Sequence, residues 1–327
     1  MSKKIQLAFS IVISLLVITS VIALTVGGST IGFDELVKIF TNPNEISKMA
    51  KIIIFEIRLP RIVGGIIVGA TLAVSGVLIK AVMKNPLADT GLLGIQSGAS
   101  LCAMIVIIII PSLMPLLPIF AFVGGIAAYI VLSILAYKDG IHPLRLVLAG
   151  VAVNALFGAF IGVISIYNAD KVQNALTWLN GSLASISVYD MWILLIYGSI
   201  ALIISMFTIP KCNLLALDDM TIVNLGENLT LIRIVIASIS VLLCAISVSI
   251  VGVIGFVGLI IPHIAKMILG VNHKVILPFS MLLGSLFVLF ADTMQVIVFS
   301  PLEMPVGIVI SMVGAPFFLF LLRKQKI

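Results

Sequence analysis

Histidine is the side chain of this sequence best suited to hold a metal ion, and the chain has three of them. His142 and His273 fall in predicted loops, and His263 follows Pro262 at a predicted helix turn. None has a second ligand at the short spacing with which metal sites are built. The sequence therefore predicts structural histidines and no metal site.

The cysteines lead to the same conclusion. Cys102, Cys212 and Cys244 lie far apart, and no Cys-x-x-Cys pair occurs. This usage predicts neither a disulfide framework nor a zinc site. We interpret the three thiols as small buried apolar side chains.

Catalytic and nucleotide-binding motifs are missing from the sequence. It contains no GxxxxGK[ST] and no Gly-Lys pair at all, so it has no phosphate-binding loop of its own. HExxH and CxxCH are also absent, and no His, Glu and Ser groups converge in the apolar segments. The prediction is a chain that is not an enzyme and binds no cofactor itself.

One acidic residue, Asp292, stands within the apolar segment 275–298. An ionisable group at membrane depth is by default a candidate for function. A proton relay usually needs several such groups, so a single acid argues against a proton-coupled carrier. We favour a helix-packing hydrogen bond for Asp292 over a direct role in transport.

The elements that would carry these residues are membrane helices. The chain has 327 residues, 61% of them hydrophobic and 10% charged, with a mean hydropathy of +1.33, whereas soluble domains carry about 25% charged residues. A helix needs roughly 20 apolar residues to cross a bilayer. Breakers and charges divide the chain into segments 5–26, 61–83, 91–110, 116–136, 143–167, 189–209, 229–250, 257–269, 275–298 and 305–323. This predicts an all-α polytopic membrane protein of about ten helices, forming a single domain over residues 1–327, with an uncleaved first helix favoured over a signal peptide.

The basic residues predict the orientation. With both termini in the cytoplasm, thirteen of the nineteen Lys and Arg residues fall on the cytoplasmic side, as the positive-inside rule requires. Five of the six external ones lie between Lys38 and Arg61. Because Pro60 suits the first turn of a helix and guanidinium groups pair with carboxylates, we predict an external docking platform at Arg58 and Arg61. Contact with lipid headgroups is the alternative. The charge is spread over loops, so no nucleic acid partner is predicted.

The segment from Ile250 reads IVGVIGFVGLIIPHIAKMILG, and its helical part of about 13 residues is too short to cross a membrane alone. Non-helical backbone at membrane depth is tolerated only where it is buried in protein or lines a watery cavity. A structural or gating role beside a translocation path is therefore one interpretation, and close helix packing at the glycines is an equal alternative. The residues concerned are Gly252, Gly255, Gly258 and Pro262.

Several ordered motifs resemble one family. Arg58-Leu59-Pro60-Arg61, followed by GGIIVGATLAVSGVLIKAVMKNPLADTGLLGIQSGAS, resembles the opening signature of the iron-siderophore and cobalamin permeases, which are type II ABC importers. The run GVIGFVGLIIPHIAKMILGVNHKVILPFSMLLGSLFVLFAD resembles a second signature. The tail, Glu303 to Gly307 and Gly314 to Phe318, and the stretch around Trp178 and Gly181 are similar to further family motifs. The resemblance covers residues from about 10 to 323.

This resemblance implies a complex in the bacterial cytoplasmic membrane. Two permease subunits, a homodimer or a pair of paralogues, would surround a central path. Two cytoplasmic ATPases would hold ATP and Mg, and an extracytoplasmic binding protein would deliver the chelate. In the family, helices five and ten line the path, which here implies residues Asn154, Phe157, Gly158, Ser165, Pro305, Gly307 and Met312.

The polar loop from Leu214 to Gly226 resembles the cytoplasmic loop of the family, which reads LALGE and then A and LG. Asp218 or Asp219 could cap a short helix that Gly226 ends, and such a stiff turn could transmit motion from an ATPase. We therefore predict ATPase coupling at Leu217, Asp218, Asp219, Thr221 and Gly226. Two departures from the family pattern stand out: Val296 replaces a usual arginine, and Asp219 replaces a glutamate.

The predicted function is thus the permease subunit of an ABC importer for an iron chelate, a ferric siderophore first of all. Haem and cobalamin remain open as substrates. An ion-coupled secondary carrier is the alternative from a different class, and a membrane-embedded enzyme is a third.

Overall fold

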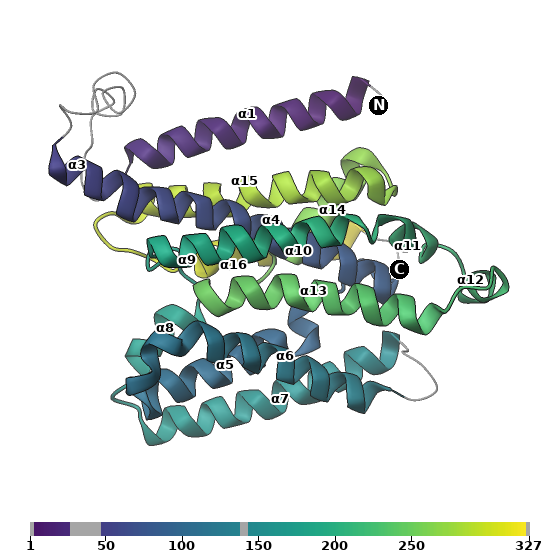
Figure 1. The fold of residues 1–327 in the computed structure, drawn as a ribbon, viewed down its shortest axis with the longest axis horizontal. Helices are drawn as coiled ribbons and strands as arrows, with labels where there is room; N and C mark the ends of the chain where they lie inside the picture. The colour runs from purple at the N-terminus through teal and green to yellow at the C-terminus, as the bar shows by residue number, and fades with distance from the viewer. Residues whose placement is uncertain (1–2, 27–46, 138–142, 325–327) are drawn as a thin grey trace.

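The computed structural model describes residues 3–26, 47–137 and 143–324, and these are largely helical (Figure 1). Short 3-10 stretches (η2, η4) and π-helical stretches (η1, η3, η5) join some of the α-helices. The elements are α1 (Lys3–Thr25), α3 (Lys48–Ile52), η1 (Ile53–Arg58), α4 (Leu59–Met83), η2 (Thr90–Leu93), α5 (Ile95–Met104), η3 (Ile105–Ile109), η4 (Pro111–Leu116), α6 (Leu117–Ala136), α7 (Pro143–Tyr167), α8 (Val172–Leu179), α9 (Val188–Ile193), η5 (Leu194–Gly198), α10 (Ser199–Met206), α11 (Ile209–Leu214), α12 (Asp219–Asn224), α13 (Leu229–Val251), α14 (Val257–Leu269), α15 (His273–Phe299) and α16 (Val306–Lys324).

Each of the ten predicted segments coincides with a helix or a run of joined helices. Two of them, 143–167 and 257–269, match α7 and α14 from end to end. Among the described residues, 7 helices are long and apolar enough to span a membrane, and three shorter apolar helices accompany them. The predicted all-helical membrane fold is confirmed.

The second span begins earlier than the sequence analysis expected. Ser47 caps α3, its Oγ accepting a hydrogen bond from the main-chain N–H of Ala50 at 3.1 Å. From there the helix continues through η1 into α4, so the described residues before Arg61 are helical and not a loop. Lys38, which we counted in the external basic cluster, lies outside the described residues.

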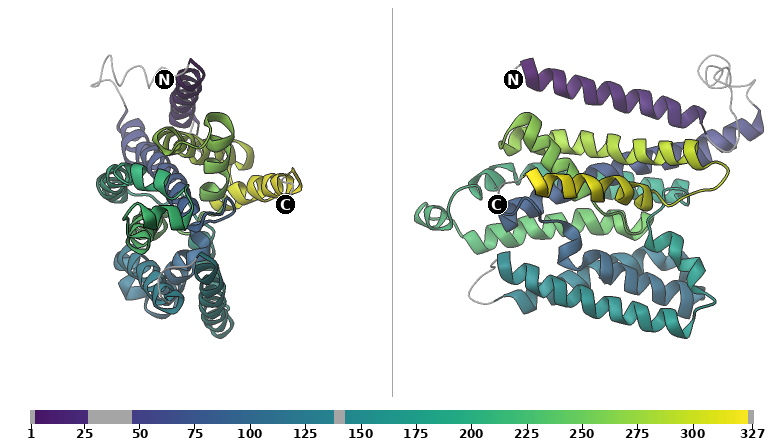
Figure 2. Two further views of the ribbon diagram at one scale, coloured as in Figure 1. Left: turned by 90° about the vertical axis from the view of Figure 1, so that its right-hand side faces the viewer. Right: turned by 180° about the vertical axis from the view of Figure 1, so that it is seen from behind.

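Helix α4 forms the centre of the bundle and packs against α13, α14 and α15. Within its most apolar window 83% of the residues are buried, against 11% for α1 and for α7, which places those two helices at the periphery. Figure 2 shows the same arrangement end-on and from behind, with α1 on one flank and α5 to α8 on the other. Side chains on α4 therefore contact neighbouring helices on several sides.

Small residues allow α4 to approach its neighbours closely. A Cβ on Gly69 would lie 2.2 Å from the carbonyl oxygen of Gly284 in α15, and one on Gly76 would lie 2.1 Å from that of Gly258 in α14. Hydroxyl groups add a polar link to α13, where Ser75 Oγ donates to the carbonyl of Ser240 at 2.6 Å and Ser240 Oγ returns a bond at 2.9 Å. Close packing and interhelical hydrogen bonds are what hold helices together in lipid.

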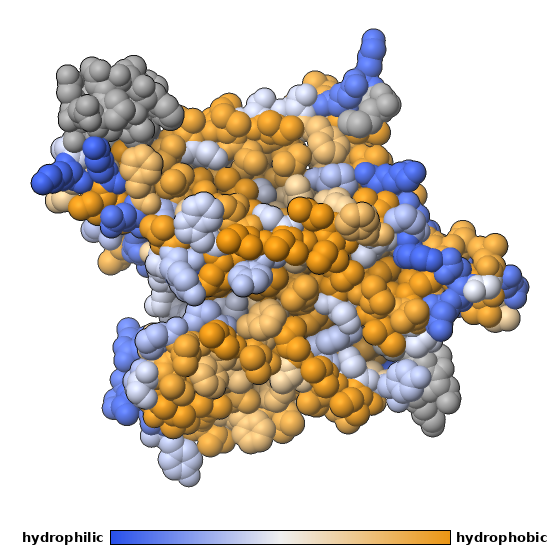
Figure 3. All heavy atoms as spheres, viewed as in Figure 1, coloured by the Kyte–Doolittle hydropathy of each residue, from blue (hydrophilic) through white to orange (hydrophobic). Residues whose placement is uncertain are grey.

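The outer surface carries a broad apolar band between two polar ends (Figure 3). Large apolar side chains on the outer helices are exposed, including Leu7, Leu135, Leu148 and Ile166. An apolar surface of this extent marks contact with lipid or with another subunit. One polar end carries α3 and the end of α15, and the opposite end carries α11 and α12 (Figure 1).

Candidate translocation and coupling sites

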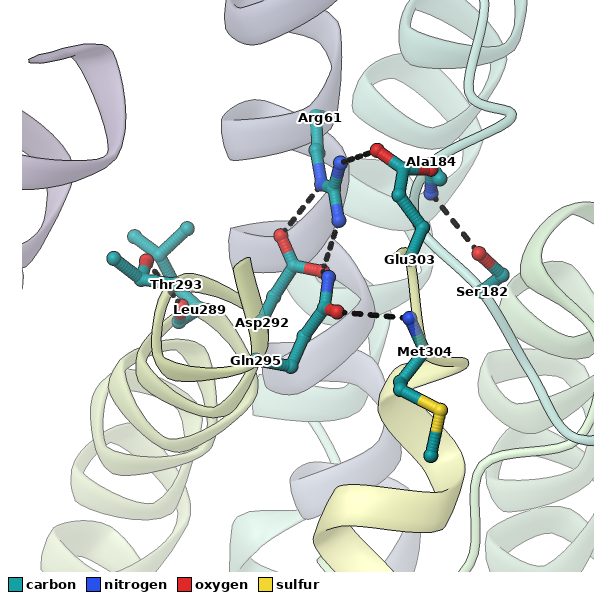
Figure 4. A network of polar contacts seen from close by, with 9 residues as sticks. All are labelled: Arg61, Ser182, Ala184, Leu289, Asp292, Thr293, Gln295, Glu303 and Met304. Atoms are coloured by element: carbon teal, nitrogen blue, oxygen red, sulfur yellow. Dashed lines mark hydrogen bonds and ion pairs between the residues drawn. The ribbon is translucent and has the colours of Figure 1, made fainter. Parts of the chain in front are cut away.

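An ion-pair network joins α4, α15 and the segment before α16 (Figure 4). Arg61 grips Asp292 in a bidentate pair, with Nε 2.7 Å from Oδ2 and Nη2 3.0 Å from Oδ1. Its Nη1 reaches Glu303 Oε1 at 3.2 Å. The side chains of Arg61 and Asp292 are 15% and 5% exposed, whereas that of Glu303 is 62% exposed. Asp292 thus packs α15 against α4 through an ion pair rather than through a neutral hydrogen bond.

Gln295 extends this network to the start of α16. Its Oε1 accepts the main-chain N–H of Met304 at 3.1 Å, and its Nε2 lies 3.5 Å from Asp292 Oδ1. The network therefore fixes the backbone that leads into α16, the helix predicted to line the path. We call Arg61, Asp292, Gln295 and Glu303 the external strut, after the side that the distribution of basic residues predicts for it.

Both predicted docking arginines already have partners within the chain. Arg58 is buried, with 6% exposure, and its Nη1 donates to the carbonyl of Leu24 at the end of α1. Arg61 is held in the external strut. It also lines a hollow of about 300 Å³, and Val296 lines this hollow too. An external carboxylate would have to compete with these contacts, so docking at the two arginines stays a prediction.

Three chain segments meet at one place. They are the residues that follow α8, the connection between α13 and α14, and the start of α16. The main-chain N–H of Ser182 donates to Val251 at 2.8 Å, and that of Gly307 donates to Gly181 at 3.2 Å. A Cβ on Gly307 would lie 2.1 Å from the carbonyl oxygen of Asn180. A Cβ on Gly252 would lie 1.9 Å from that of Trp178. Side chains at these glycines would push the segments apart, and we call this place the crossing.

A hollow of about 480 Å³ lies beside the crossing. The backbone between Gly252 and Phe256 is not helical, and Phe256 has a φ of 65°, which is rare for a residue with a side chain. Such backbone at membrane depth is expected beside a cavity or within protein. The residues lining the hollow are Leu179, Asn180, Val253, Gly255, Gly307, Ile308, Ser311 and Met312.

The sequence left two roles open for the glycines of this region: close helix packing, and a position beside a translocation path. Gly252 and Gly258 are sites of close backbone approach, whereas a Cβ on Gly255 would meet nothing within 4 Å. Gly255 lines the hollow, and Pro262 is buried inside α14. Packing and proximity to a cavity are thus both found, at different residues.

The α7 candidates are not brought to this hollow within one chain. Asn154 turns toward the bundle, donating from Nδ2 to the carbonyl of Gly91 at 2.9 Å and accepting from Ser97 at 2.6 Å. Phe157 is half-buried against the core, and Ser165 bonds back to the carbonyl of Ile161 at 2.8 Å. Gly158 is exposed, with open space around it. Helix α7 packs against α5 and α6, on the opposite flank from α1 (Figure 2).

At the other end of the molecule, the loop between α11 and α13 forms the predicted short helix. Asp218 occupies the N-cap of α12 but makes no side-chain capping bond, and Thr221 is exposed on that helix. Gly226 follows with a φ of 80°, the left-handed conformation expected for a residue that ends a helix. Figure 1 shows α12 projecting from the bundle.

Asp219 ties α12 to two long helices. Lys84, just after α4, donates to Oδ1 at 2.7 Å, and Arg233 of α13 reaches both oxygens at 3.0 and 2.9 Å. Burial raises the pKa of the Asp219 carboxyl, but these hydrogen bonds and charges outweigh it and hold the pKa below its ordinary value. Lys84 also donates to the carbonyl of Leu217. We call residues 217–226 the coupling segment, after the role that the sequence analysis predicts for it.

Comparison with known proteins decides the family. The model of the FecCD transport family matches residues 15–324. The chain belongs to the FecCD transport family. It is 36% identical to the Fe(3+)-citrate import system permease protein YfmE of Bacillus subtilis, over 99% of this chain and 96% of that protein. It is 38% identical to the hemin transport system permease protein HmuU of Yersinia pestis, over 83% of each chain. A solved ABC transporter of the metal-chelate type, in an inward-facing conformation, superposes with a TM-score of 0.86 at 30% identity, covering 98% of this chain and 99% of that one.

Sequence reasoning missed several residues of this FecCD-family chain. It did not foresee that Lys84 and Arg233 bind the Asp219 carboxylate. Nor did it foresee that Ser311 and Asn180 both line the hollow beside the crossing. The signal for Lys84 was its position at the end of a span, opposite the acidic loop. Within the part of the chain that the structure describes, no group of three His, Cys, Asp or Glu side chains is arranged to hold a metal ion.

Proposed function

We propose that this chain is the membrane-spanning permease subunit of an ATP-driven importer for a ferric chelate. Its FecCD family membership and the iron-citrate and hemin permeases among its relatives support this assignment. The observation that carries it is the hollow at the crossing, where non-helical backbone and α16 meet on an open side of the apolar helical bundle. The chain itself is not an enzyme in this proposal.

The division of labour follows from the two ends of the bundle. The coupling segment projects where a cytoplasmic ATPase could grip it, and Asp219 connects it to α4 and α13. Two ATPase subunits would hold ATP and Mg, so this chain would need no cofactor. A second permease, identical or paralogous, would complete the path, because α7 and α16 each leave exposed apolar faces. With the coupling segment on the cytoplasmic side, both termini are cytoplasmic, and the external strut faces the binding protein.

The assignment is tested by reconstituting the chain with its ATPase and binding protein in liposomes. Uptake of ferric citrate, a hydroxamate siderophore, hemin and cobalamin would be measured with ATP inside the liposomes. We expect ATP-dependent uptake of one ferric chelate class. Uptake that needs an ion gradient and no ATP would instead establish a secondary carrier.

A cysteine at Met312 should react with a polar thiol reagent in a nucleotide-dependent way, because its side chain is 65% exposed beside the hollow. The background variant would lack Cys102, Cys212 and Cys244. Ile310→Cys is the matched control, since this residue lies on the same helix with 0% exposure and should stay unlabelled. A cysteine at Gly158 tests α7 in the same assay. Absence of labelling at Met312 and Gly158 in every transport state would exclude both helices from the path.

External docking at Arg58 and Arg61 is a further part of the proposal. Reversing both residues to Glu should weaken docking of the binding protein and its stimulation of ATP hydrolysis. Because Arg61 also holds Asp292, Asp292→Ala serves as the control that loosens the strut without reversing charge at the docking residues. Docking that is unchanged at physiological salt would refute the platform.

A further inference from the structure

A second cavity lies at the end of the bundle that carries the coupling segment. It has a volume of about 460 Å³, within the range of roughly 300–1,000 Å³ typical of small-ligand sites. Helices α4, α11, α14 and α15 supply most of its walls. Five of its lining residues are basic, namely Lys80, Lys84, His263, Lys266 and His273. Among the described residues, the lining includes no carboxylate.

Two of these basic groups are held in place by the surrounding structure. The ammonium group of Lys80 donates to the carbonyl of Leu259 at 2.5 Å. The Oδ1 of Asn213 accepts the main-chain N–H of His273 and lies 2.9 Å from its ring Nδ1. An amide oxygen can only accept, so this assignment puts the ring hydrogen on Nδ1. Lys80 and His273 are therefore fixed in the wall of the cavity.

Nearby acids offset only part of the positive charge of the lysines that line the cavity. Asp219 pairs with Lys84 at 2.7 Å, and Asp89 lies close enough to Lys80 to interact with its charge. Lys266 is exposed and, among the described residues, its side chain forms no hydrogen bond or ion pair. Lys266 and His263 thus face the cavity without an opposing carboxylate, whereas the ring N–H of His273 is directed at Asn213.

We propose that this basic pocket binds a phosphate group, carried either by an anionic phospholipid or by free phosphate. Three lysine ammonium groups and the ring of His263 line one small volume, which suits a phosphate with its several acceptor oxygens. Val77, Ala81 and Ile276 supply apolar walls beside the lysines. Lys84 lines the pocket and also holds Asp219, so a bound phosphate would act at the root of the coupling segment. This site is separate from the hollow at the crossing and does not depend on which chelate is carried.

The test uses the full chain in neutral phosphatidylcholine nanodiscs, with thermal unfolding as the readout. One arm titrates inorganic phosphate, with chloride at equal ionic strength as the reference. The other arm replaces part of the lipid with phosphatidylglycerol. We expect one of these probes to raise the unfolding midpoint, and its apparent affinity to fall about tenfold in Lys266→Gln, the loss expected for one charged hydrogen bond.

Lys274→Gln is the matched control, because Lys274 is an exposed lysine at the start of α15 that does not line the pocket. It should bind the probe as the wild type does, whereas His263→Gln should weaken binding like Lys266→Gln. A response to inorganic phosphate identifies the free ion, and a response to phosphatidylglycerol alone identifies the lipid. The proposal is overturned if neither probe shifts the midpoint, or if both pocket variants respond like Lys274→Gln.

Discussion

Replacement of Asp219 with alanine is expected to abolish transport by the assembled complex. The carboxylate is the group through which α12 is tied to Lys84 and Arg233, and hence to the central helices α4 and α13. A contact can drive transport only if it differs between nucleotide states. Without Asp219, movement of α12 by an ATPase would no longer pull on the bundle. ATP hydrolysis should then lose its stimulation by loaded binding protein.

The variant should lose some stability. The side chain of Asp219 is 46% exposed and solvent screens its charges, but the side chain of Arg233 is 4% exposed and loses a carboxylate partner. Loss of uptake in complexes that still assemble and unfold cooperatively would separate coupling from folding. Uptake into liposomes and ATPase rates of the same preparation provide the measurement.

Asp218→Ala is the matched control, because the neighbouring acid makes no capping bond. This variant should keep more transport than Asp219→Ala. Adding Gly226→Pro to Asp219→Ala should give the same loss or a stronger one, since proline cannot adopt the φ of 80° found at Gly226. Normal transport by Asp219→Ala would move the coupling contact elsewhere, for instance to the loop from Lys80 to Asp89.

Helix positions were largely predictable from this sequence, because a membrane span is a local property of about 20 residues. The short α14 was recognised from its length and its flanking glycines alone. The helix from Lys48 to Arg58 was missed because its charged residues suggested a loop. Burial of Arg58 against the end of α1 makes that charge compatible with a helix, and such a partner is invisible in local sequence.

The sites were predictable only where a local conformation defines them. The left-handed Gly226 and the crowded Gly252 follow from turn chemistry and helix packing. By contrast, Asp292 meets Arg61 across 231 residues, and no pattern in either segment specifies that pair. Phe256 adopts a backbone conformation that local sequence reasoning assigns to glycine, and its side chain lies against Gly314 of α16, a contact that no local pattern specifies.

The Arg61–Asp292 pair leads to the second large expected effect. Asp292→Ala should lower the thermal stability of the purified chain strongly, because it leaves a largely buried guanidinium with Glu303 alone. Breaking a buried ion pair by removing one partner costs about 3–5 kcal/mol. The backbone at Met304 should also loosen, since Gln295 would lose its neighbour in the external strut. Unfolding midpoints in detergent, with labelling of a cysteine at Met312, would report both effects.

Glu303→Ala is the matched control, because it removes a carboxylate from the same arginine at a position that is 62% exposed. Exposed pairs contribute roughly 0–1 kcal/mol, so its midpoint should stay close to that of the wild type. The double variant Arg61→Met with Asp292→Leu should be more stable than Asp292→Ala, since neither charge is left buried alone. If Asp292→Ala and Glu303→Ala lower the midpoint equally, burial does not govern the strut, and α16 must be held mainly by the crossing, where Gly307 meets Gly181 and Asn180.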